Sequence, residues 1–429
     1  MSSIQSIQRI GVLFVLMSLP FAVSASVDRS LSGEPAVKPG IEVLLEEPEF
    51  LALVTGKRVG LITNPTGVDH QLRSTIDLLH QHPDITLAAL YGPEHGVRGD
   101  VYAGDKVADA TDERTGVPVF SLYGATRRPT PEMLEGIDVM IYDIQDVGSR
   151  SYTFIYTMAY GMEACGEAGI PFLVLDRPNP AGANIVDGNI LNPEFSSFVG
   201  LYAIPYQYGM TPGEVALMFN AEFNSTACEL TVVPMRGYTR DMWQWHTGLP
   251  FVPPSNHIPR ADVATYYNLT GIIGEIRHIS IGVGYTLPFE TLAAPWIDRY
   301  ALTEALTELN LPGLLFRPIS YQPRYGAFGP AQGRAAETCH GVQIFITDYN
   351  AVRPVTAQIH MMVTLQRLFP DSGLFTDEHA GRTLFDKVMG TDIVRQQVLA
   401  GASAEEILAG FEPALSEFMA TRAKYLMYE

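Results

Sequence analysis

Short apolar runs alternate with amphipathic stretches through the first half of the chain. Runs of a length typical of buried strands occur at 58–63, 85–91, 118–123, 137–142, 170–175 and 230–234. Apolar residues with helical spacing lie between them and predict helices at 40–50, 74–81, 130–134, 154–168 and 215–223. Strands that alternate with helices favour right-handed βαβ units. The first half is therefore predicted to be an α/β domain with a doubly wound, mostly parallel sheet.

The second half follows a different pattern. A proline-dense stretch at 249–255 suits a domain boundary, and most of the periodic segments beyond it are helical. Helices are predicted at 261–269, 301–309, 355–369, 384–389 and 403–428, with a strand at 342–346. We therefore expect one domain over 39–255 and a second, smaller α+β domain over 256–429.

The N-terminal segment has the features of a secretory signal peptide. Its only charged residue is Arg9, an apolar run follows from Ile10 to Leu19, and small residues end at Ala25. The run is shorter than the roughly 20 residues that a spanning helix needs, and Pro20 interrupts it. We predict cleavage after Ala25, a linker over 26–38, and a secreted or periplasmic protein with no membrane span once the signal is removed.

The acidic composition restricts the classes of partner. The formal net charge is −19, and it becomes −20 when Arg9 is removed with the signal peptide. Nucleic acid and anionic lipid both require a basic surface, so the predicted partner is a small neutral or peptide-bearing glycan. The three cysteines, Cys165, Cys228 and Cys339, are too few for a disulfide framework, and the sequence leaves a single Cys228–Cys339 bridge open.

Polar side chains follow several of the predicted N-terminal strands. They are Asn64 after the first strand, Glu94, His95 and Arg98 after the second, Asp143, Gln145, Asp146 and Arg150 after the 137–142 strand, and Asp176, Arg177 and Asn179 after the 170–175 strand. The carboxyl ends of parallel strands share one edge of a sheet, so we expect these groups to converge on one crevice. Each of them alone also suits a turn or a helix cap, but the mixture of carboxylates, amides and guanidinium groups favours a site.

Glu94 is the candidate general acid. It lies between Pro93 and His95, close to Tyr91, and partial desolvation favours the protonated form of a carboxyl group. The alternative for Glu94 is a structural ion pair with Arg98. His95 would orient Glu94 or bind substrate, and the equally weighted alternative is a satisfied, partly buried histidine.

Asp143 and Asp146 are the candidates for a second catalytic carboxylate, because they are close enough to influence one another. With Arg150 they can equally form a structural ion network. Tyrosines, which suit sugar rings, are dense around the expected crevice: Tyr142, Tyr152, Tyr156, Tyr202, Tyr206 and Tyr208. The alternative for about half of them is an ordinary place in the core.

Motifs of several other enzyme classes are missing from the sequence. There is no G-x-S-x-G elbow, no G-x-G-x-x-G after a strand, no P-loop and no H-E-x-x-H. Metal-dependent and dinucleotide-dependent chemistry is therefore disfavoured, and we predict no metal and no cofactor.

Three ordered motifs give the chain a family resemblance. They are Y-G-P-E-H-G-V-R-G at 91–99, D-I-Q-D-V-G-S-R at 143–150 and D-R-P-N-P at 176–180. With these motifs the chain resembles the exo-β-N-acetylmuramidases of peptidoglycan turnover, a glycoside hydrolase family once catalogued as a domain of unknown function. The likeness continues through 187–188 and 288–290 to 294–296, and so covers nearly the whole mature chain.

The resemblance implies a Rossmann-like N-terminal catalytic domain, a C-terminal auxiliary domain and a cleft between them. It implies removal of a terminal N-acetylmuramic acid from the non-reducing end of glycan fragments, without a metal or nucleotide. The presumed catalytic glutamate of the family matches Glu94. On this basis catalytic roles are expected for Glu94, His95, Asp143 and Asp146, and substrate-binding roles for Asn64, Arg98, Gln145, Arg150, Tyr152, Asp176, Arg177, Asn179 and Glu290.

One stretch departs from the family pattern. Where members often carry Glu-Gly-Thr-Asn and then Gly-Arg-Gly-Thr, this chain has Glu275-Ile276-Arg277-His278 and then Gly282-Val283-Gly284-Tyr285. An asparagine and an arginine suited to holding substrate are thus replaced by His278 and Val283.

The sequence therefore predicts an exo-acting glycoside hydrolase that releases terminal β-linked N-acetylmuramic acid or a related amino sugar, with Glu94 as general acid. The main alternative is a non-catalytic protein that binds a cell-wall sugar. A third hypothesis is hydrolysis of another cell-wall bond, such as an ester or a lactyl ether.

Overall fold

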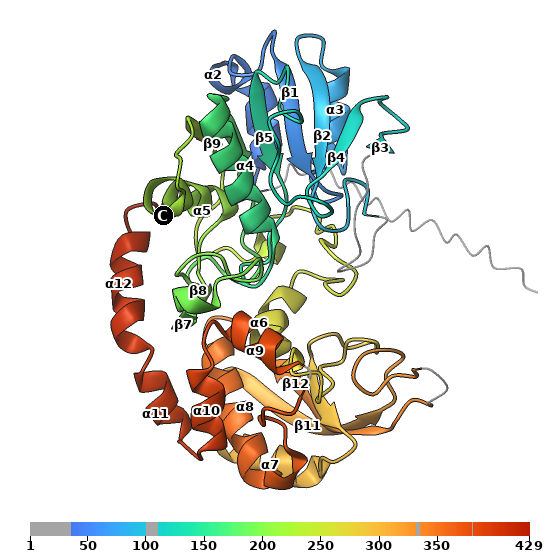
Figure 1. Ribbon diagram of the computed structural model, residues 1–429, viewed down its shortest axis with the longest axis vertical. Helices are drawn as coiled ribbons and strands as arrows, with labels where there is room; N and C mark the ends of the chain where they lie inside the picture. The colour runs from blue at the N-terminus through green and yellow to red at the C-terminus, as the bar shows by residue number, and fades with distance from the viewer. Residues whose placement is uncertain (1–35, 100–109, 332–334, 380) are drawn as a thin grey trace, which may run out of the picture. The chain divides into compact units, whose positions relative to one another are not determined.

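The computed structural model describes residues 36–99, 110–331, 335–379 and 381–429 (Figure 1). The predicted signal peptide and most of the predicted linker lie outside these ranges. So do residues 100–109 of the 100–115 stretch, whose length predicts a lid or binding loop. None of the described helices is long and apolar enough to cross a membrane.

A seven-stranded sheet forms the first half of the described structure (Figure 1). Its order is β3-β4-β2-β1-β5-β6-β9; β3 is antiparallel to β4, and the other neighbours pair in parallel. The strands are β1 (Arg58–Thr63), β2 (Thr86–Gly92), β3 (Ala110–Thr111), β4 (Pro118–Ser121), β5 (Val139–Asp143), β6 (Phe172–Leu175) and β9 (Leu230–Val233). The chain moves from β1 outward to β4 and then returns to the other side of β1 with β5. This order confirms the predicted doubly wound, Rossmann-like α/β fold.

Helices cover both faces of this sheet. They are α1 (Gly40–Glu46), α2 (Pro48–Leu51), α3 (Thr75–Gln81), α4 (Phe154–Ala168) and α5 (Pro212–Met218). Leu61 and Ile141 pack in one core cluster with residues of α1 and α3, whereas Ile62 and Tyr142 pack in another with residues of α4 and α5. Successive strand residues point to opposite faces, so a sheet buried on both sides requires the continuous apolar runs seen in the sequence.

Local signals begin and end these helices. The Ile76 amide donates to Ser74 Oγ at 3.1 Å at the start of α3, and Thr211 and Glu214 form a capping box on α5. Gly169, with a φ of 69°, ends α4. These positions match the sequence predictions closely.

Three helix predictions in the first half are wrong in part. The helix predicted over 40–50 is divided at Glu47 into α1 and α2, and two other predictions differ as follows. The 130–134 stretch forms turns, and the Met133 amide lies 3.4 Å from Thr130 Oγ1 without a helix following. The helix predicted over 215–223 leaves α-helical geometry after Met218 and continues as a π-helical turn, Phe219–Phe223. Tertiary packing overrides the local helix signal at both places.

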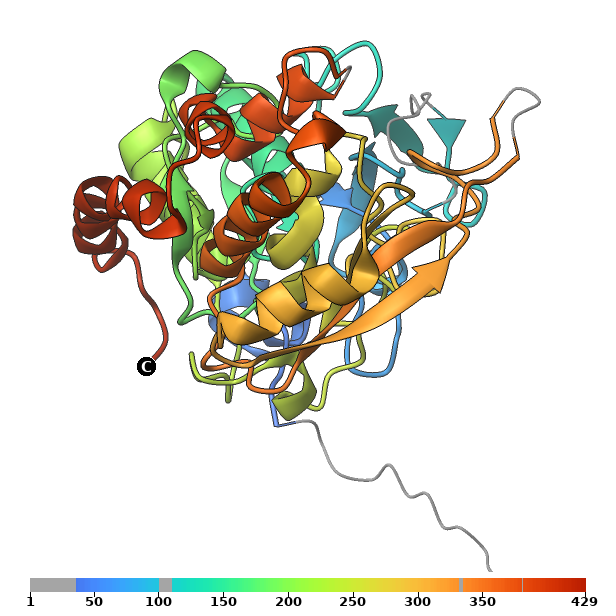
Figure 2. The same ribbon diagram turned by 90° about the horizontal axis from the view of Figure 1, so that it is seen from below.

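A three-stranded antiparallel sheet is the base of the second half, in the order β10-β12-β11. Its elements are β10 (Thr291–Ala294), β11 (Leu314–Tyr321), β12 (Cys339–Ile346), α6 (Val263–Gly274), α7 (Arg299–Glu308), α8 (Pro354–Leu368) and α9 (Arg382–Met389). Figure 2 shows α7 against the β11–β12 hairpin, and both of these strands contact it. The sequence pattern missed β11, because this edge strand contains Arg317 and Pro318 and three of its eight residues are exposed.

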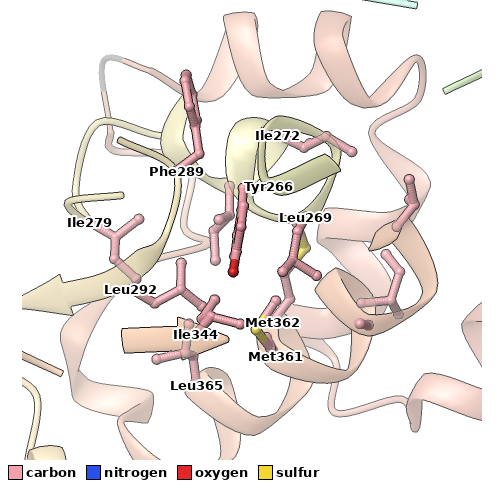
Figure 3. Packing of buried hydrophobic residues seen from close by; sticks show 14 of the residues in the cluster. Tyr266, Leu269, Ile272, Ile279, Phe289, Leu292, Ile344, Met361, Met362 and Leu365 are labelled. Carbon is pink, nitrogen blue, oxygen red and sulfur yellow. The ribbon is translucent and has the colours of Figure 1, made fainter. Parts of the chain in front are cut away.

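Helix α6 lies at the centre of the second core. Figure 3 shows Tyr266, Leu269 and Ile272 of α6 packed with Leu292, Ile344 and Met362 of the surrounding strands and α8. The Ile346 amide donates to the Tyr266 hydroxyl at 3.0 Å, which satisfies the polar end of that side chain. This arrangement confirms a second, smaller α+β unit. The placement of its boundary at 255/256 stays a prediction.

The predicted helix over 403–428 is two helices rather than one. They are α11 (Ala404–Ala409) and α12 (Glu412–Arg422), and α10 (Ile393–Leu399) precedes them. The end of the chain then returns to the first half, where the Tyr428 hydroxyl donates to Asp176 Oδ2 at 2.6 Å and the Arg240 amide donates to Glu429 O at 2.7 Å. The last residues of the predicted second domain therefore stabilise the first. The remaining short elements are β7 (Asp187–Ile190), β8 (Pro205–Gln207) and the 3₁₀ turns Pro193–Phe195, Gln244–His246 and Pro370–Ser372.

Candidate active site

A cavity of about 630 Å³ lies beyond the carboxyl end of β2. The first half supplies Glu94, His95 and Tyr123, together with the Ser151–Phe154 segment that leads into α4. Residues between 257 and 289 of the second half form much of the remaining lining, including Tyr267, Glu275, Arg277 and Phe289. This volume falls within the range of pockets that enclose a small ligand, and the carboxyl edge of a doubly wound sheet is where such pockets form.

Glu94 reaches the cavity from a tight turn. The Gly96 amide donates to Pro93 O at 3.0 Å, and His95 has a φ of 73°, which makes Pro93–Gly96 a type II β-turn. The half-buried Glu94 carboxylate accepts a hydrogen bond from Thr153 Oγ1 at 2.9 Å. Tyr123 also lines the cavity, and burial together with the Glu94 charge and hydrogen bond raises the pKa of its hydroxyl to about 12. Thr153 and Tyr123 are thus two neutral partners of Glu94.

Glu275 is a second carboxyl group in the same cavity. It caps the C-terminal end of α6, so its position depends on the second core rather than on the sheet. Burial raises the pKa of Glu275 above its usual value of 4.5, and the nearby Arg277 guanidinium acts in the opposite direction. Most glycoside hydrolases use two carboxyl groups in different environments within one active site.

Unusual backbone geometry concentrates at this cavity. Across the described residues, the non-glycine residues with positive φ are Leu72, His95, Arg277, Phe289 and Asn310. Three of these five, His95, Arg277 and Phe289, line the cavity. Such residues cost about 1–3 kcal/mol each and persist only where the surroundings hold them, and they cluster at functional sites.

Asp143 does not line the cavity, and its predicted catalytic role stays a prediction. Its carboxylate is fully buried and accepts two hydrogen bonds from Arg177, from Nε at 2.5 Å and from Nη2 at 2.8 Å. Thr75 Oγ1 donates to the same carboxylate at 2.5 Å, and Arg177 Nη2 also donates to Val68 O at 2.9 Å. Arg177 is therefore committed to this ion pair and is not available to a substrate in this arrangement.

Three further predicted site residues are buried and do not line the cavity: Gln145, Asp146 and Asn179. Asp146 Oδ2 accepts from the Tyr208 hydroxyl and from the Gly148 amide, while burial raises the pKa of Asp146 to about 6. Gln145 Nε2 donates to Pro178 O at 2.6 Å, and Asn179 Nδ2 donates to Met210 O at 2.9 Å. These contacts fix the loops that end β5 and β6.

Asp176 and Arg150 join distant parts of the chain. Asp176 accepts from the Gly213 amide, Thr211 Oγ1 and the Tyr428 hydroxyl, and burial raises its pKa to about 6. Arg150 is fully buried and donates to four backbone carbonyls, two of them at the end of α9. Burial lowers the pKa of Arg150 to about 10. Neither residue lines the cavity.

Three other predicted binding residues also lie outside the cavity lining. Asn64 Oδ1 accepts from the Thr66 amide at 3.0 Å, and its strand end shares the sheet edge as predicted. Arg98 forms a two-pronged pair with Asp112, at 2.9 and 3.0 Å, and this lowers the pKa of Asp112 to about 2. Glu290 Oε1 accepts from Arg260 at 2.8 Å. Of the predicted site residues, the cavity brings together Glu94, His95 and Tyr152.

Comparison with known proteins places this chain in a family. The family models described as exo-beta-N-acetylmuramidase NamZ, N-terminal and C-terminal, match residues 59–262 and 265–428. The peptidoglycan beta-N-acetylmuramidase NamZ of Bacillus subtilis (strain 168) is 48% identical over 409 residues, which cover 95% of each chain. The chain belongs to the exo-β-N-acetylmuramidase NamZ family. The predicted family resemblance is thereby confirmed, and with it the assignment to the glycosidases.

Two solved structures of DUF1343 family proteins from Bacteroides fragilis share the fold of this NamZ family member. One has a TM-score of 0.86 and 45% sequence identity, and covers 92% of this chain and 100% of its own. The other has a TM-score of 0.73 and 29% identity, and covers 92% of this chain and 99% of its own. The Rossmann-like sheet with a smaller C-terminal unit is thus shared with both.

The cavity draws on both NamZ family segments. Glu94 and His95 lie in the N-terminal match, whereas Glu275 and Arg277 lie in the C-terminal match. Sequence reasoning about strand ends missed Glu275 and Arg277, because they follow a helix of the other domain. The available signal was the 275–285 departure from the family pattern, since Val283 of that stretch also lines the cavity.

The three cysteines lie apart from the cavity lining. Cys165, Cys228 and Cys339 are all buried and free, so the bridge that the sequence left open is not formed. Within the described ranges, no group of three or more His, Cys, Asp or Glu residues is arranged to hold a metal ion.

Proposed function

We propose that this protein is an exo-β-N-acetylmuramidase that releases terminal β-linked N-acetylmuramic acid from peptidoglycan fragments. The observation that carries the proposal is that Glu94 and Glu275 both line one cavity of about 630 Å³. The family match and the 48% identical Bacillus subtilis peptidoglycan beta-N-acetylmuramidase support the same substrate class. No feature of the described residues favours the alternative of a non-catalytic sugar-binding protein.

Glu94 acts as the general acid in this proposal. Its side chain enters the cavity from the strained turn after β2, and Thr153 Oγ1 fixes one of its oxygens at 2.9 Å. A carboxyl group positioned in this way protonates the glycosidic oxygen as the bond to the sugar breaks. Such proton transfer typically contributes 10²- to 10⁴-fold in rate.

Glu275 is the second catalytic carboxyl group in the proposal, in place of Asp143 and Asp146. Asp143 is paired with Arg177, and Asp146 accepts hydrogen bonds from Tyr208 and Gly148. Both carboxyl groups therefore have protein partners and neither lines the cavity. Burial raises the pKa of Glu275 from 4.5, which makes its carboxylate a stronger base than an exposed glutamate. It would activate water or stabilise the positive charge that develops on the sugar ring.

The test compares aryl β-N-acetylmuramides with good and poor leaving groups. If Glu94 donates the proton, Glu94→Gln lowers kcat/KM by about 10²- to 10⁴-fold for a poor leaving group and much less for dinitrophenol, which departs without protonation. Glu275→Gln should lower both substrates by a similar factor. Glu308→Gln is the matched control, because Glu308 is an exposed residue of α7 and does not line the cavity.

Each outcome of this test has a definite meaning. A reversed leaving-group pattern would exchange the roles of Glu94 and Glu275. Turnover close to that of the unaltered enzyme in both variants would remove the two-carboxylate mechanism. Calorimetric binding of the free sugar without turnover of any glycoside would instead favour the binding protein.

We further propose that the protein acts outside the cytoplasm after cleavage following Ala25. Support comes from the charge-poor, apolar 1–25 segment and from the location of peptidoglycan outside the membrane. Mass spectrometry of the N-terminus of the exported protein tests this directly. A mature chain that begins at Met1, or retention in the cytoplasm, would contradict it.

A further inference from the structure

The proposed substrate differs from N-acetylglucosamine by one group, a lactyl ether that carries a carboxylate at neutral pH. We propose that Arg277 binds this carboxylate and thereby selects muramic acid over glucosamine at the cavity. The inference rests on the proposed function, because it names the residue that would give that function its sugar specificity.

The charge around the cavity leaves one suitable partner for an anionic sugar. Among the described residues that line it, Arg277 is the only lysine or arginine, whereas Glu94 and Glu275 are both carboxyl groups. Burial lowers the pKa of His257, and the neighbouring His95 acts in the same direction, so His257 is neutral near pH 7. An anionic substrate would meet repulsion from the two carboxylates unless a guanidinium compensated for it.

The Arg277 guanidinium has its donors available. Within the described part of the chain, no hydrogen bond or ion pair closer than 4 Å engages its side chain, and the residue is exposed. Arg277 lines the same cavity as Glu275, and its charge opposes the effect of burial on the pKa of Glu275. By contrast, Arg260 of the same domain is paired with both Asp262 and Glu290. A planar guanidinium with free N–H groups suits two-pronged recognition of a carboxylate.

The backbone places Arg277 at this position at a cost. Its φ of 61° lies in the left-handed region, where glycine or asparagine is more stable than arginine. The Arg277 amide donates to Gly274 O at 3.0 Å and so continues the end of α6 into the cavity wall. An arginine at a position that favours glycine indicates that its side chain has a role, because the fold itself would be served better by glycine.

The experiment uses Arg277→Gly, which keeps the left-handed backbone, and Arg277→Lys, which keeps the charge but loses the planar fork. Arg367→Ala is the matched control, because Arg367 is exposed on α8 and does not line the cavity. Each purified full-length mature enzyme is assayed on nitrophenyl β-N-acetylmuramide and nitrophenyl β-N-acetylglucosaminide. Binding of free N-acetylmuramic acid and N-acetylglucosamine is measured by calorimetry in parallel.

We expect Arg277→Gly to lower kcat/KM on the muramide by about 10- to 100-fold, mostly through KM, and to leave the glucosaminide unchanged or improved. Arg277→Lys should fall between, and Arg367→Ala should match the unaltered enzyme. Equal losses on both substrates, or no loss on either, would overturn the role of Arg277.

The calorimetric arm separates this inference from the proposed function. An unaltered enzyme that binds muramic acid through Arg277 but cleaves no muramide would contradict the proposed hydrolysis and keep the role of Arg277. An enzyme that cleaves the muramide with the same selectivity after Arg277→Gly would keep the function and overturn the role of Arg277. An enzyme that neither binds nor cleaves the muramic sugar would overturn both.

Discussion

Arg177 holds both carboxylate oxygens of Asp143, with Nε at 2.5 Å from Oδ1 and Nη2 at 2.8 Å from Oδ2. Both side chains are buried, and they follow neighbouring strands, β5 and β6. The pair therefore ties together two strand ends at the sheet edge where the cavity begins. Polar residues at that edge fall into two groups: some stabilise the loops, and others line the cavity.

This division predicts the effect of Asp143→Asn. Removing the carboxylate leaves the Arg177 charge buried without compensation, which typically costs about 3–5 kcal/mol in the free energy of unfolding. Urea unfolding should show that loss. The fraction that stays folded at low temperature should keep kcat within about tenfold of the unaltered enzyme, since Asp143 does not line the cavity. A large loss of kcat without loss of stability would return Asp143 to the catalytic group.

Arg150→Lys tests the second structural assignment. Arg150 Nη1 donates to Asn189 O and Ile204 O, each at 2.7 Å, and Nη2 donates to Met389 O at 2.7 Å and Val388 O at 3.2 Å. A single lysine ammonium cannot donate to all four carbonyl groups. The variant should therefore lose about 2–4 kcal/mol in the free energy of unfolding.

The measurement for Arg150→Lys is thermal unfolding together with KM. Arg353→Lys is a matched control, because Arg353 also donates to backbone carbonyls but at an exposed position. A raised KM with no loss of stability in Arg150→Lys would support the sugar-binding role that the sequence predicted.

Much of the fold could be predicted because its signals are local. The strand over 58–63 and the helix over 154–168 have the predicted bounds, since apolar runs and Gly169 mark them without ambiguity. The errors arise where tertiary contacts decide the outcome. In the edge strand β11, Arg317 and Pro318 interrupt the apolar residues, and Gly410 separates α11 from α12 in a segment with continuous helical spacing.

The site was harder to predict than the fold. Parallel strands do bring Asn64, Asp143 and Asp176 to one edge, as the sequence suggested. The sequence could not show which groups there are already paired, because the partner of Asp143 is 34 residues away and that of Asp176 is 252 residues away. Glu275 was not recognised as a catalytic candidate, since its access to the cavity depends on how α6 packs in the second core.

Asp146 predicts a definite dependence of stability on pH. Its pKa is about 6 in the folded protein, against a usual value of 3.8, so the folded state binds the proton more tightly than the unfolded state. This stabilisation is complete below about pH 4 and is lost as the pH rises through 6. Relative to Asp146→Asn, the unaltered protein should lose about 1–2 kcal/mol of unfolding free energy between pH 5 and 7.5. Urea titrations at both pH values measure the difference, and a constant difference would show that Asp146 does not titrate in this window.

The pH profile of catalysis should respond to Arg277. Glu275 must be ionised to act as a base, and burial raises its pKa while Arg277 lowers it. The value of kcat/KM should therefore fall as the pH drops through the pKa of Glu275. Arg277→Gly removes the cationic neighbour that lowers the pKa of Glu275, so the acid limb of kcat/KM should move to higher pH. The glucosaminide is the substrate of choice for this profile, because it lacks the lactyl carboxylate and reports on the enzyme groups alone. Arg367→Ala should leave the limb in place, and an unmoved limb in Arg277→Gly would mean that another group than Glu275 sets it.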